Sequence, residues 1–140
     1  MSRRVVISGL GVVSSIGIGW REFWDNLLKG KSGISPISSL DTSNQFTHNG
    51  GEVKHFRPEE FIPEDKIFTL SRASQFGLAA AKLAIQDANL SDELIANTTI
   101  GTCVGLTSGP IQVIEHINDK LLKNEELTSD LAGQLPVNTA

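Results

Sequence analysis

The sequence predicts an α/β protein, because strand-like runs alternate with stretches of helical period. Two short, mostly apolar runs, Arg3 to Ser8 and Thr98 to Gly105, are typical of strands buried on both faces. Three longer stretches place apolar residues on one helical face, which gives the order strand, helix, loop, helix, strand, helix. Two strands cannot make a sheet with helices on both faces, so we expect these 140 residues to be a piece of a larger α/β unit.

A first helix is predicted after the glycine-rich turn that follows the first strand. Gly30 is a natural stop for this helix. Its apolar positions share one face: Trp20, Phe23, Trp24, Leu27 and Leu28. From Lys31 to Asp65 no period persists, so we expect a long irregular excursion that is functional or packed on another element.

The second helix, predicted from Arg72 to Ala88, has the clearest pattern. One stripe of it is small or apolar, which allows the close backbone approach of a sheet or a partner helix. The stripe consists of Ala73, Phe76, Gly77, Ala80, Ala81, Ala84, Ile85 and Ala88. Asn89 is expected to end the helix, and Leu90 to Asn97 to form a connecting loop.

A third helix is predicted after Pro110. Its apolar face is formed by Ile111, Ile114, Ile117, Leu121 and Leu122. After Lys123 the chain becomes polar, and no further element is predicted.

Composition excludes several classes of protein. The net charge of −4 and the absence of a basic stripe argue against a nucleic-acid binder. A single cysteine excludes an intrachain disulfide. Arg3 and Arg4 precede an apolar stretch, but four glycines break it up before residue 20, so we expect neither a signal peptide nor a membrane span.

The segment Gly9 to Ser14 imitates a dinucleotide-binding fingerprint. That fingerprint needs a small residue at its end and a helix that begins at once, so that the pyrophosphate meets the helix N-terminus. Ser14 stands in place of the small residue, and Gly17 and Gly19 follow before any helix. We interpret the segment as a structural turn.

The segment Gly105 to Gly109 lies between a strand and a helix, the setting of a nucleophile elbow. An elbow needs a base beside its nucleophile, and the central Thr107 has none, because His116 would project away from it. We therefore expect a loop that shapes a pocket.

The remaining reactive side chains form no predicted site. Cys103 lies in the middle of the second strand, so we expect a buried small hydrophobe and not a nucleophile. His48, His55 and His116 lack the spacing of metal ligands. The sequence thus predicts no metal site and no acid–base pair.

The opening from Arg3 to Gly17 resembles the start of the β-ketoacyl-[acyl carrier protein] synthases, the condensing enzymes of fatty acid and polyketide synthesis. Further stretches resemble that family in the same order along the chain. They are Phe23 to Ile34, Leu40 to Ser43, Gly51 to Val53, Ser74 to Ala81, Asp87 to Leu90, Ile100 to Gly101 with Gly105, and Leu135 to Asn138.

This resemblance implies a thiolase-like αβαβα fold, of which residues 1–140 would be the N-terminal part of the first half. They would form one partial ketosynthase domain that stops before the catalytic cysteine. The implied enzyme is a cytoplasmic acyltransferase that needs no cofactor. It joins an acyl thioester to malonyl-carrier protein by decarboxylative Claisen condensation. Acyl carrier protein would be its partner, and a homodimer or heterodimer its assembly.

The resemblance places no catalytic residue in this chain, which alone is predicted to be inactive. Thr107, Ser108 and Gly109 fall where the family's loop closes the acyl pocket, and the small Ser108 predicts a deeper or more polar pocket. The sequence departs from the family's pattern in two places: Ser71 replaces an acidic residue, and Asp65 to Thr69 is poorer in the positive charge that such enzymes use to dock carrier protein.

Two alternatives remain open. The first is a non-elongating subunit of the chain-length-factor kind, which lacks the cysteine. The second is a small interaction module that presents the stripe between Ala73 and Ala88 to a partner.

Overall fold

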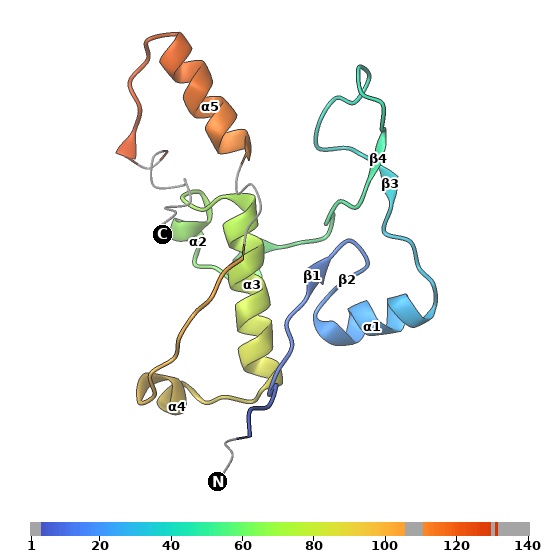
Figure 1. The fold of residues 1–140 in the computed structure, drawn as a ribbon, viewed down its shortest axis with the longest axis vertical. Helices are drawn as coiled ribbons and strands as arrows, with labels where there is room; N and C mark the ends of the chain where they lie inside the picture. The colour runs from blue at the N-terminus through green and yellow to red at the C-terminus, as the bar shows by residue number, and fades with distance from the viewer. Residues whose placement is uncertain (1–3, 106–110, 130, 132–140) are drawn as a thin grey trace.

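The computed structural model describes residues 4–105, 111–129 and 131, and α3 (Arg72–Asp87) stands at its centre (Figure 1). Two antiparallel ribbons of two-residue strands lie to one side of α3. The remaining elements are α1 (Trp20–Leu28), α2 (Glu64–Ile67), α4 (Asp92–Ala96), α5 (Ile111–Leu122) and a 3-10 turn, η1 (Pro58–Glu60). In one ribbon β1 (Val13–Ser14) pairs with β2 (Gly17–Ile18), and in the other β3 (Ser35–Pro36) pairs with β4 (Asn49–Gly50).

The three predicted helices are confirmed within a residue of their expected ends. After α1, Gly30 has φ 66°, the left-handed conformation that glycine adopts without strain. At the start of α3, the Ser71 hydroxyl accepts the Ser74 N–H at 3.2 Å. Serine is among the preferred N-cap residues, so Ser71 is a sufficient cap for α3 without the acidic residue that the resemblance led us to expect there. Asn89, just after α3, has φ 51°.

The core lies where the sequence predicted an irregular excursion. Phe56, Phe61 and Ile62 are buried with Ala79 of α3. The Phe56 ring stacks on Phe61 at 5.8 Å between centroids and meets the edge of Phe76 at 4.9 Å. The excursion is therefore packed on the second predicted helix, which was one of its two expected roles.

Polar side chains of α3 fix the same region to the helix. The Arg72 guanidinium carbon lies 4.8 Å from the Phe56 ring and 4.7 Å from the Phe76 ring, within range of a cation–π interaction. The buried Gln75 donates through Nε2 to the carbonyls of Ile67 and Leu70, at 3.0 and 3.2 Å. These bonds join the start of α3 to the last carbonyl of α2 and to the carbonyl of Leu70 in the connection that follows it.

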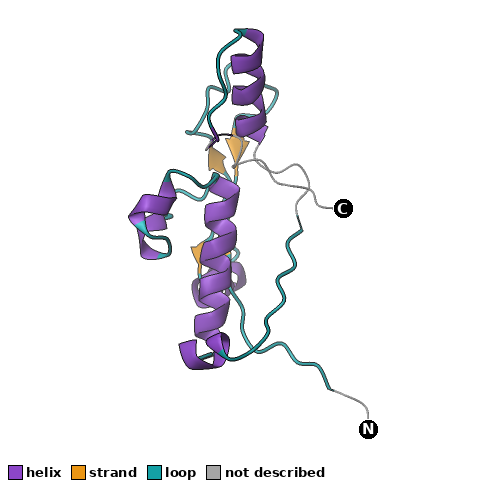
Figure 2. Cartoon of the chain, turned by 90° about the vertical axis from the view of Figure 1, so that its left-hand side faces the viewer, coloured by secondary structure: helices purple, strands orange, loops and turns teal. Residues whose placement is uncertain are grey.

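Neither predicted central strand forms in the described part of the chain. Residues 4–8 and 98–105 carry no regular structure, and Figure 2 shows the second segment as a loop that runs beside α3. Val5 is 95% exposed, Ile7 84% and Val104 72%. The prediction of two buried strands is wrong for this chain. A strand forms only when another strand pairs with it, and within residues 4–105 no strand pairs with either segment.

The prediction of a plain loop from Leu90 to Asn97 is also wrong, because it contains α4. The Ser91 hydroxyl accepts the Leu94 N–H at 3.2 Å, and Asp92 and Glu93 place negative charge in the first turn. On α5 the predicted apolar face is largely exposed, with Leu121 at 55% and Leu122 at 83%.

Candidate functional site

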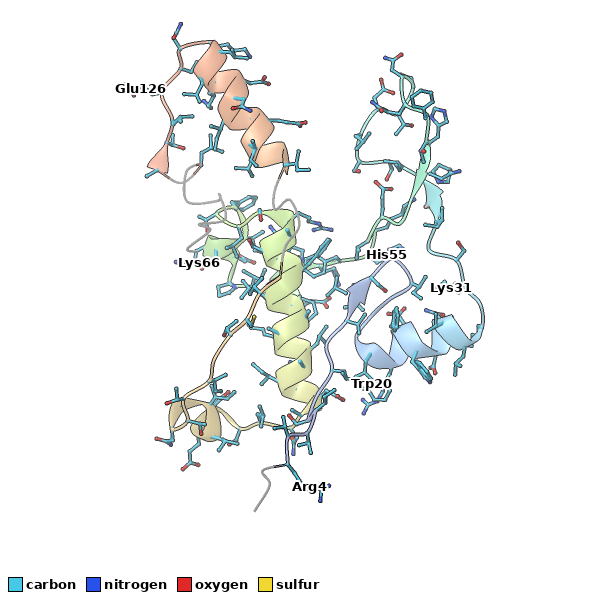
Figure 3. The ribbon with its side chains drawn as sticks, in the orientation of Figure 1. Arg4, Trp20, Lys31, His55, Lys66 and Glu126 are labelled. Atoms are coloured by element: carbon cyan, nitrogen blue, oxygen red, sulfur yellow. The ribbon has the colours of Figure 1, made fainter. Side chains whose placement is uncertain are left out.

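A hollow of about 410 Å³ lies between the first turn of α1 and the last turns of α3. Part of its lining is apolar and comes from Leu10, Ile18 and Leu83. The rest of the lining is Gly19, Trp20, Arg21, Glu22, Gln86 and Asp87. Figure 3 shows Trp20 at the start of α1, beside the C-terminal end of α3. The lining thus comes from three segments, two near the N-terminus and one more than sixty positions later in α3.

Asp87, the last residue of α3, joins these three segments. Its carboxylate accepts the Trp20 indole N–H at 2.5 Å and the Leu10 backbone N–H at 3.0 Å. The Trp20 bond, the Leu10 bond and the nearby Arg21 charge together lower the pKa of Asp87. A carboxyl with a lowered pKa is ionised near neutral pH, so Asp87 suits an anchoring role better than that of a general acid.

The other carboxylate of the hollow also binds the chain itself. Oε2 of Glu22 accepts the Ile18 N–H at 2.8 Å, which occupies a donor next to the uncapped start of α1. Sequence reasoning missed this arrangement. Leu10 and Trp20 lie 77 and 67 positions from Asp87, and no local pattern reports a contact over such a distance.

The segment from Gly9 to Ser14 packs directly on α3 and leads into β1, and the tight turn itself falls at Ser15 and Ile16, just after the segment predicted to form it. A Cβ atom on Gly11 would overlap the Ala80 carbonyl, and one on Gly9 would overlap the Ala84 carbonyl and the Ala88 nitrogen. After Ser14 the chain continues into the β1–β2 ribbon, and no helix follows at once. These glycines therefore permit contact between two backbones, and part of the small-residue stripe is already covered by the chain's own N-terminal segment.

Cys103 is exposed, which contradicts its predicted burial. The prediction failed together with that of its strand, because the segment from residue 98 to 105 has no paired neighbour to cover it.

The predicted pocket loop, Thr107, Ser108 and Gly109, lies outside the described residues. Its role stays a prediction, as does the direction in which His116 projects from it.

The histidines do not gather into a site. Nδ1 of His48 lies 3.3 Å from the Thr42 hydroxyl, a contact within one exposed loop. Across residues 4–105 and the described part of 111–131, no group of His, Cys, Asp or Glu side chains could hold a metal ion. No helix in the same residues is long and apolar enough to cross a membrane.

The surface that precedes α3 carries more acidic than basic groups. Arg57 pairs with Glu59 at 3.4 Å and with Glu60 at 3.5 Å. The short helix α2 then begins with Glu64 and Asp65 and has one lysine in its last turn. The weak positive charge noted in the sequence is therefore also a property of this surface.

The sequence matches the family described as "Beta-ketoacyl synthase, N-terminal domain" over residues 2–138. It is 34% identical over 113 residues to 3-oxoacyl-[acyl-carrier-protein] synthase 2 of Synechocystis sp., covering 81% of this chain and 27% of that protein. It is 33% identical over 121 residues to the Staphylococcus aureus protein of the same name, covering 86% and 29%. The chain thus spans less than a third of the length of these relatives.

Solved structures resemble the fold over almost the whole chain. The ishigamide ketosynthase/chain length factor superposes with a TM-score of 0.78 at 32% identity, covering 94% of this chain and 34% of that one. A β-ketoacyl synthase from Burkholderia phymatum gives 0.80 at 26% identity, covering 96% and 34%. A type II PKS acyl-carrier protein in complex with its ketosynthase gives 0.51 at 30% identity, covering 94% and 30%.

Proposed function

The chain belongs to the β-ketoacyl synthase family, and from this membership we propose that it supplies the N-terminal part of a β-ketoacyl-[acyl carrier protein] synthase. The match to the family's N-terminal domain over residues 2–138 carries the proposal. The fold is the N-terminal part of the thiolase-like α/β fold of the neighbouring ketosynthases.

The proposed reaction proceeds in two stages. An acyl group is first transferred from its carrier to a cysteine, with the carrier thiol as leaving group. Malonyl-carrier protein then loses CO₂, and the resulting carbanion attacks the acyl thioester and expels the cysteine thiolate. Backbone amides stabilise the oxyanion and histidines the enolate. The family resemblance places the cysteine and both histidines outside residues 1–140.

Within this reaction the chain would contribute shape rather than chemistry. Thr107, Ser108 and Gly109 are proposed to close the acyl pocket. Replacing Ser108 with isoleucine in the complete enzyme should shift loading toward shorter acyl groups, because the larger side chain shortens the pocket. Equal loading across acyl lengths in both forms would contradict this role.

The exposed apolar segments support the view that more protein covers this chain. The chain exposes 11,279 Å², whereas a compact protein of 15.1 kDa exposes about 7,000 Å². The sequence pattern of residues 4–8 and 98–105 predicts strands buried on both faces, whereas both segments are exposed in the structure. We propose that further strands of a ketosynthase domain complete a sheet with them.

The proposed partner is acyl carrier protein, and the proposed setting is a cytoplasmic homodimer or heterodimer. The support for the partner is that one structural neighbour is a ketosynthase in complex with an acyl-carrier protein. Because α2 begins with Glu64 and Asp65, we propose that carrier-protein docking here depends less on basic groups before α3 than it does in family members that carry a basic cluster there.

The two alternatives are less well supported. One neighbour is named as both a ketosynthase and a chain length factor, so the comparison does not separate these roles. The residue at the nucleophile position separates them, because an elongating enzyme has cysteine there. A module that presents the α3 stripe is disfavoured, because residues 9–11 already lie on Ala80, Ala84 and Ala88.

A chimera tests the proposal. This chain replaces the matching segment of the Synechocystis synthase, and the chimera is given acyl- and malonyl-carrier protein. We expect 3-ketoacyl product from the chimera and none from the 140-residue chain alone. A chimera that unfolds cooperatively at the temperature of its parent yet forms no product would contradict the proposal. Covalent acylation of the isolated chain would contradict its predicted inactivity.

A further inference from the structure

One asparagine of this chain is placed for a spontaneous chemical change. Asn49 is exposed, and it is followed by Gly50 in β4, at the base of the β3–β4 hairpin. Asn49–Gly50 is the only Asn–Gly pair in the sequence. Glycine has no side chain to hinder its backbone nitrogen, so this nitrogen can approach the side-chain amide before it more readily than in any other pair. We propose that Asn49 is a deamidation site whose rate is set by the opening of this hairpin.

The reaction needs only water. The Gly50 nitrogen attacks Cγ of Asn49 and gives up its proton, and the side-chain amide leaves as ammonia. The product is a cyclic imide between the two residues. Water then opens the ring at either carbonyl, which yields aspartate or isoaspartate at position 49.

The folded hairpin opposes the first step. Asn49 lies opposite Pro36 and Gly50 opposite Ser35, in an extended backbone that keeps the Gly50 nitrogen away from Cγ of Asn49. The ladder is weak, however, because each strand has only two residues. A hairpin this short opens locally at a small cost in free energy.

A carboxylate outside the ladder holds the hairpin closed. Glu52 accepts the Ser38 N–H at 2.9 Å and the Ser38 hydroxyl at 3.0 Å through one oxygen, and the Ser39 N–H at 2.8 Å through the other. Lys54 adds a bond of 3.3 Å to the Pro36 carbonyl. The two sides of the hairpin therefore cannot separate unless the Glu52 bonds break, together with the bond of 2.9 Å that the Ile37 N–H donates to the His48 carbonyl. We expect loss of the Glu52 bonds to raise the rate at Asn49.

The modification would in turn change the hairpin. Aspartate at position 49 adds a negative charge near Glu52. Isoaspartate routes the main chain through Cβ, so the opposition of Ser35 to Gly50 can no longer be kept. Conversion at Asn49 is thus expected to leave the hairpin open.

Incubation of the full chain at mildly alkaline pH tests the proposal, with peptide mapping by mass spectrometry and enzymatic detection of isoaspartate. We expect conversion at Asn49 and none at Asn89 or Asn124, which precede leucine and glutamate. Glu52→Gln should raise the rate at Asn49 several-fold. Glu59→Gln, at a carboxylate that pairs with Arg57, should leave it unchanged.

A free peptide that spans Gln45 to Lys54 gives the rate of the open chain. If Asn49 stays intact in the folded protein after the peptide has converted fully, it is not a modification site. If the folded protein, the Glu52→Gln variant and the peptide all convert at one rate, the hairpin does not control the reaction. None of these readouts depends on ketosynthase activity.

Discussion

Burial differs between two parts of the molecule, and composition does not reveal the difference. One part is the region from Val53 to Leu83, and the other consists of two segments, residues 4–8 and 98–105. The part of the first region up to Asp65 was predicted to be irregular, yet it holds the buried residues Phe56, Phe61 and Ile62, which pack with Ala79 of the predicted helix α3. The two segments are richer in β-branched residues than the first region, yet they are exposed to solvent. The buried residues of the first region find one another within some thirty positions, and Val13 and Ile18 of the β1–β2 ribbon pack against them. A strand, in contrast, forms only when a neighbouring strand pairs with it. Burial follows from available partners, and apolar sequence alone does not secure it.

Removing a core ring should have the largest effect on stability. Phe56→Ala deletes the contacts with Phe61, Phe76 and Arg72 and leaves a cavity, so unfolding should become easier by about 3–4 kcal/mol. Val6→Ala, in a bare segment, should cost under about 0.5 kcal/mol. Urea unfolding followed by tryptophan fluorescence measures both. Similar losses from the two variants would mean that the segments are not bare.

Adding side chains to two glycines extends the comparison. Gly11→Val meets the Ala80 backbone, which cannot move aside, and should cost about 2–3 kcal/mol. At Gly101, in the second exposed segment, a Cβ meets no atom within 4 Å, so Gly101→Val should leave the unfolding midpoint close to wild type. A destabilised Gly101→Val variant would show that the segment from residue 98 to 105 is covered in this chain.

A glycine inside α3 should respond in the opposite direction. A Cβ at Gly77 meets nothing within 4 Å, so Gly77→Ala should stabilise the chain by about 0.5–1 kcal/mol through helix propensity. Thermal unfolding by circular dichroism measures the gain. In the chimera we expect the gain to disappear if other parts of the ketosynthase pack on the stripe that contains Gly77.

The smallest effect is expected at the hairpin, and it should depend on pH. Hydrogen bonds from Ser39 and Ser38 lower the pKa of Glu52 from 4.5 to about 2. The ionised carboxylate therefore stabilises the folded chain above pH 4.5, and this contribution is lost as pH falls toward 2. Glu52→Gln should be less stable than wild type near neutral pH, and the difference should vanish on acidification. If Glu52→Gln remains less stable than wild type in acid, the loss of stability does not come from the charge of the Glu52 carboxylate.

Helices could be predicted from this sequence because their signals are local. Gly30 and Asn89 mark helix ends by their own conformation, and each lies where the pattern placed it. Ser71, which the pattern did not name as a cap, stands directly before the predicted start of the helix at Arg72. The family could be recognised in the same way, from motifs in order. The anchoring role of Asp87 and that of Glu52 could not be predicted, because each depends on partners that the fold brings from elsewhere in the chain.

The two strand predictions failed for a related physical reason. The apolar runs at residues 4–8 and 98–105 are typical of strands that are packed on both faces. Such a run does not report whether the neighbouring strands and helices are present. The predicted burial of Cys103 depended on the second of these strands, so it is wrong for the same reason, and Cys103 is exposed. For Thr107, Ser108 and Gly109 the prediction still rests on the family resemblance alone.

Hydrogen–deuterium exchange tests the central claim most directly, measured on the 140-residue chain and on the Synechocystis chimera. The account predicts that residues 4–8 and 98–105 exchange rapidly in the isolated chain and become strongly protected in the chimera. Residues 72–87 should be protected in both proteins. Slow exchange of the two segments in the isolated chain, or rapid exchange in an active chimera, would contradict the claim that they are strands awaiting the rest of a ketosynthase domain.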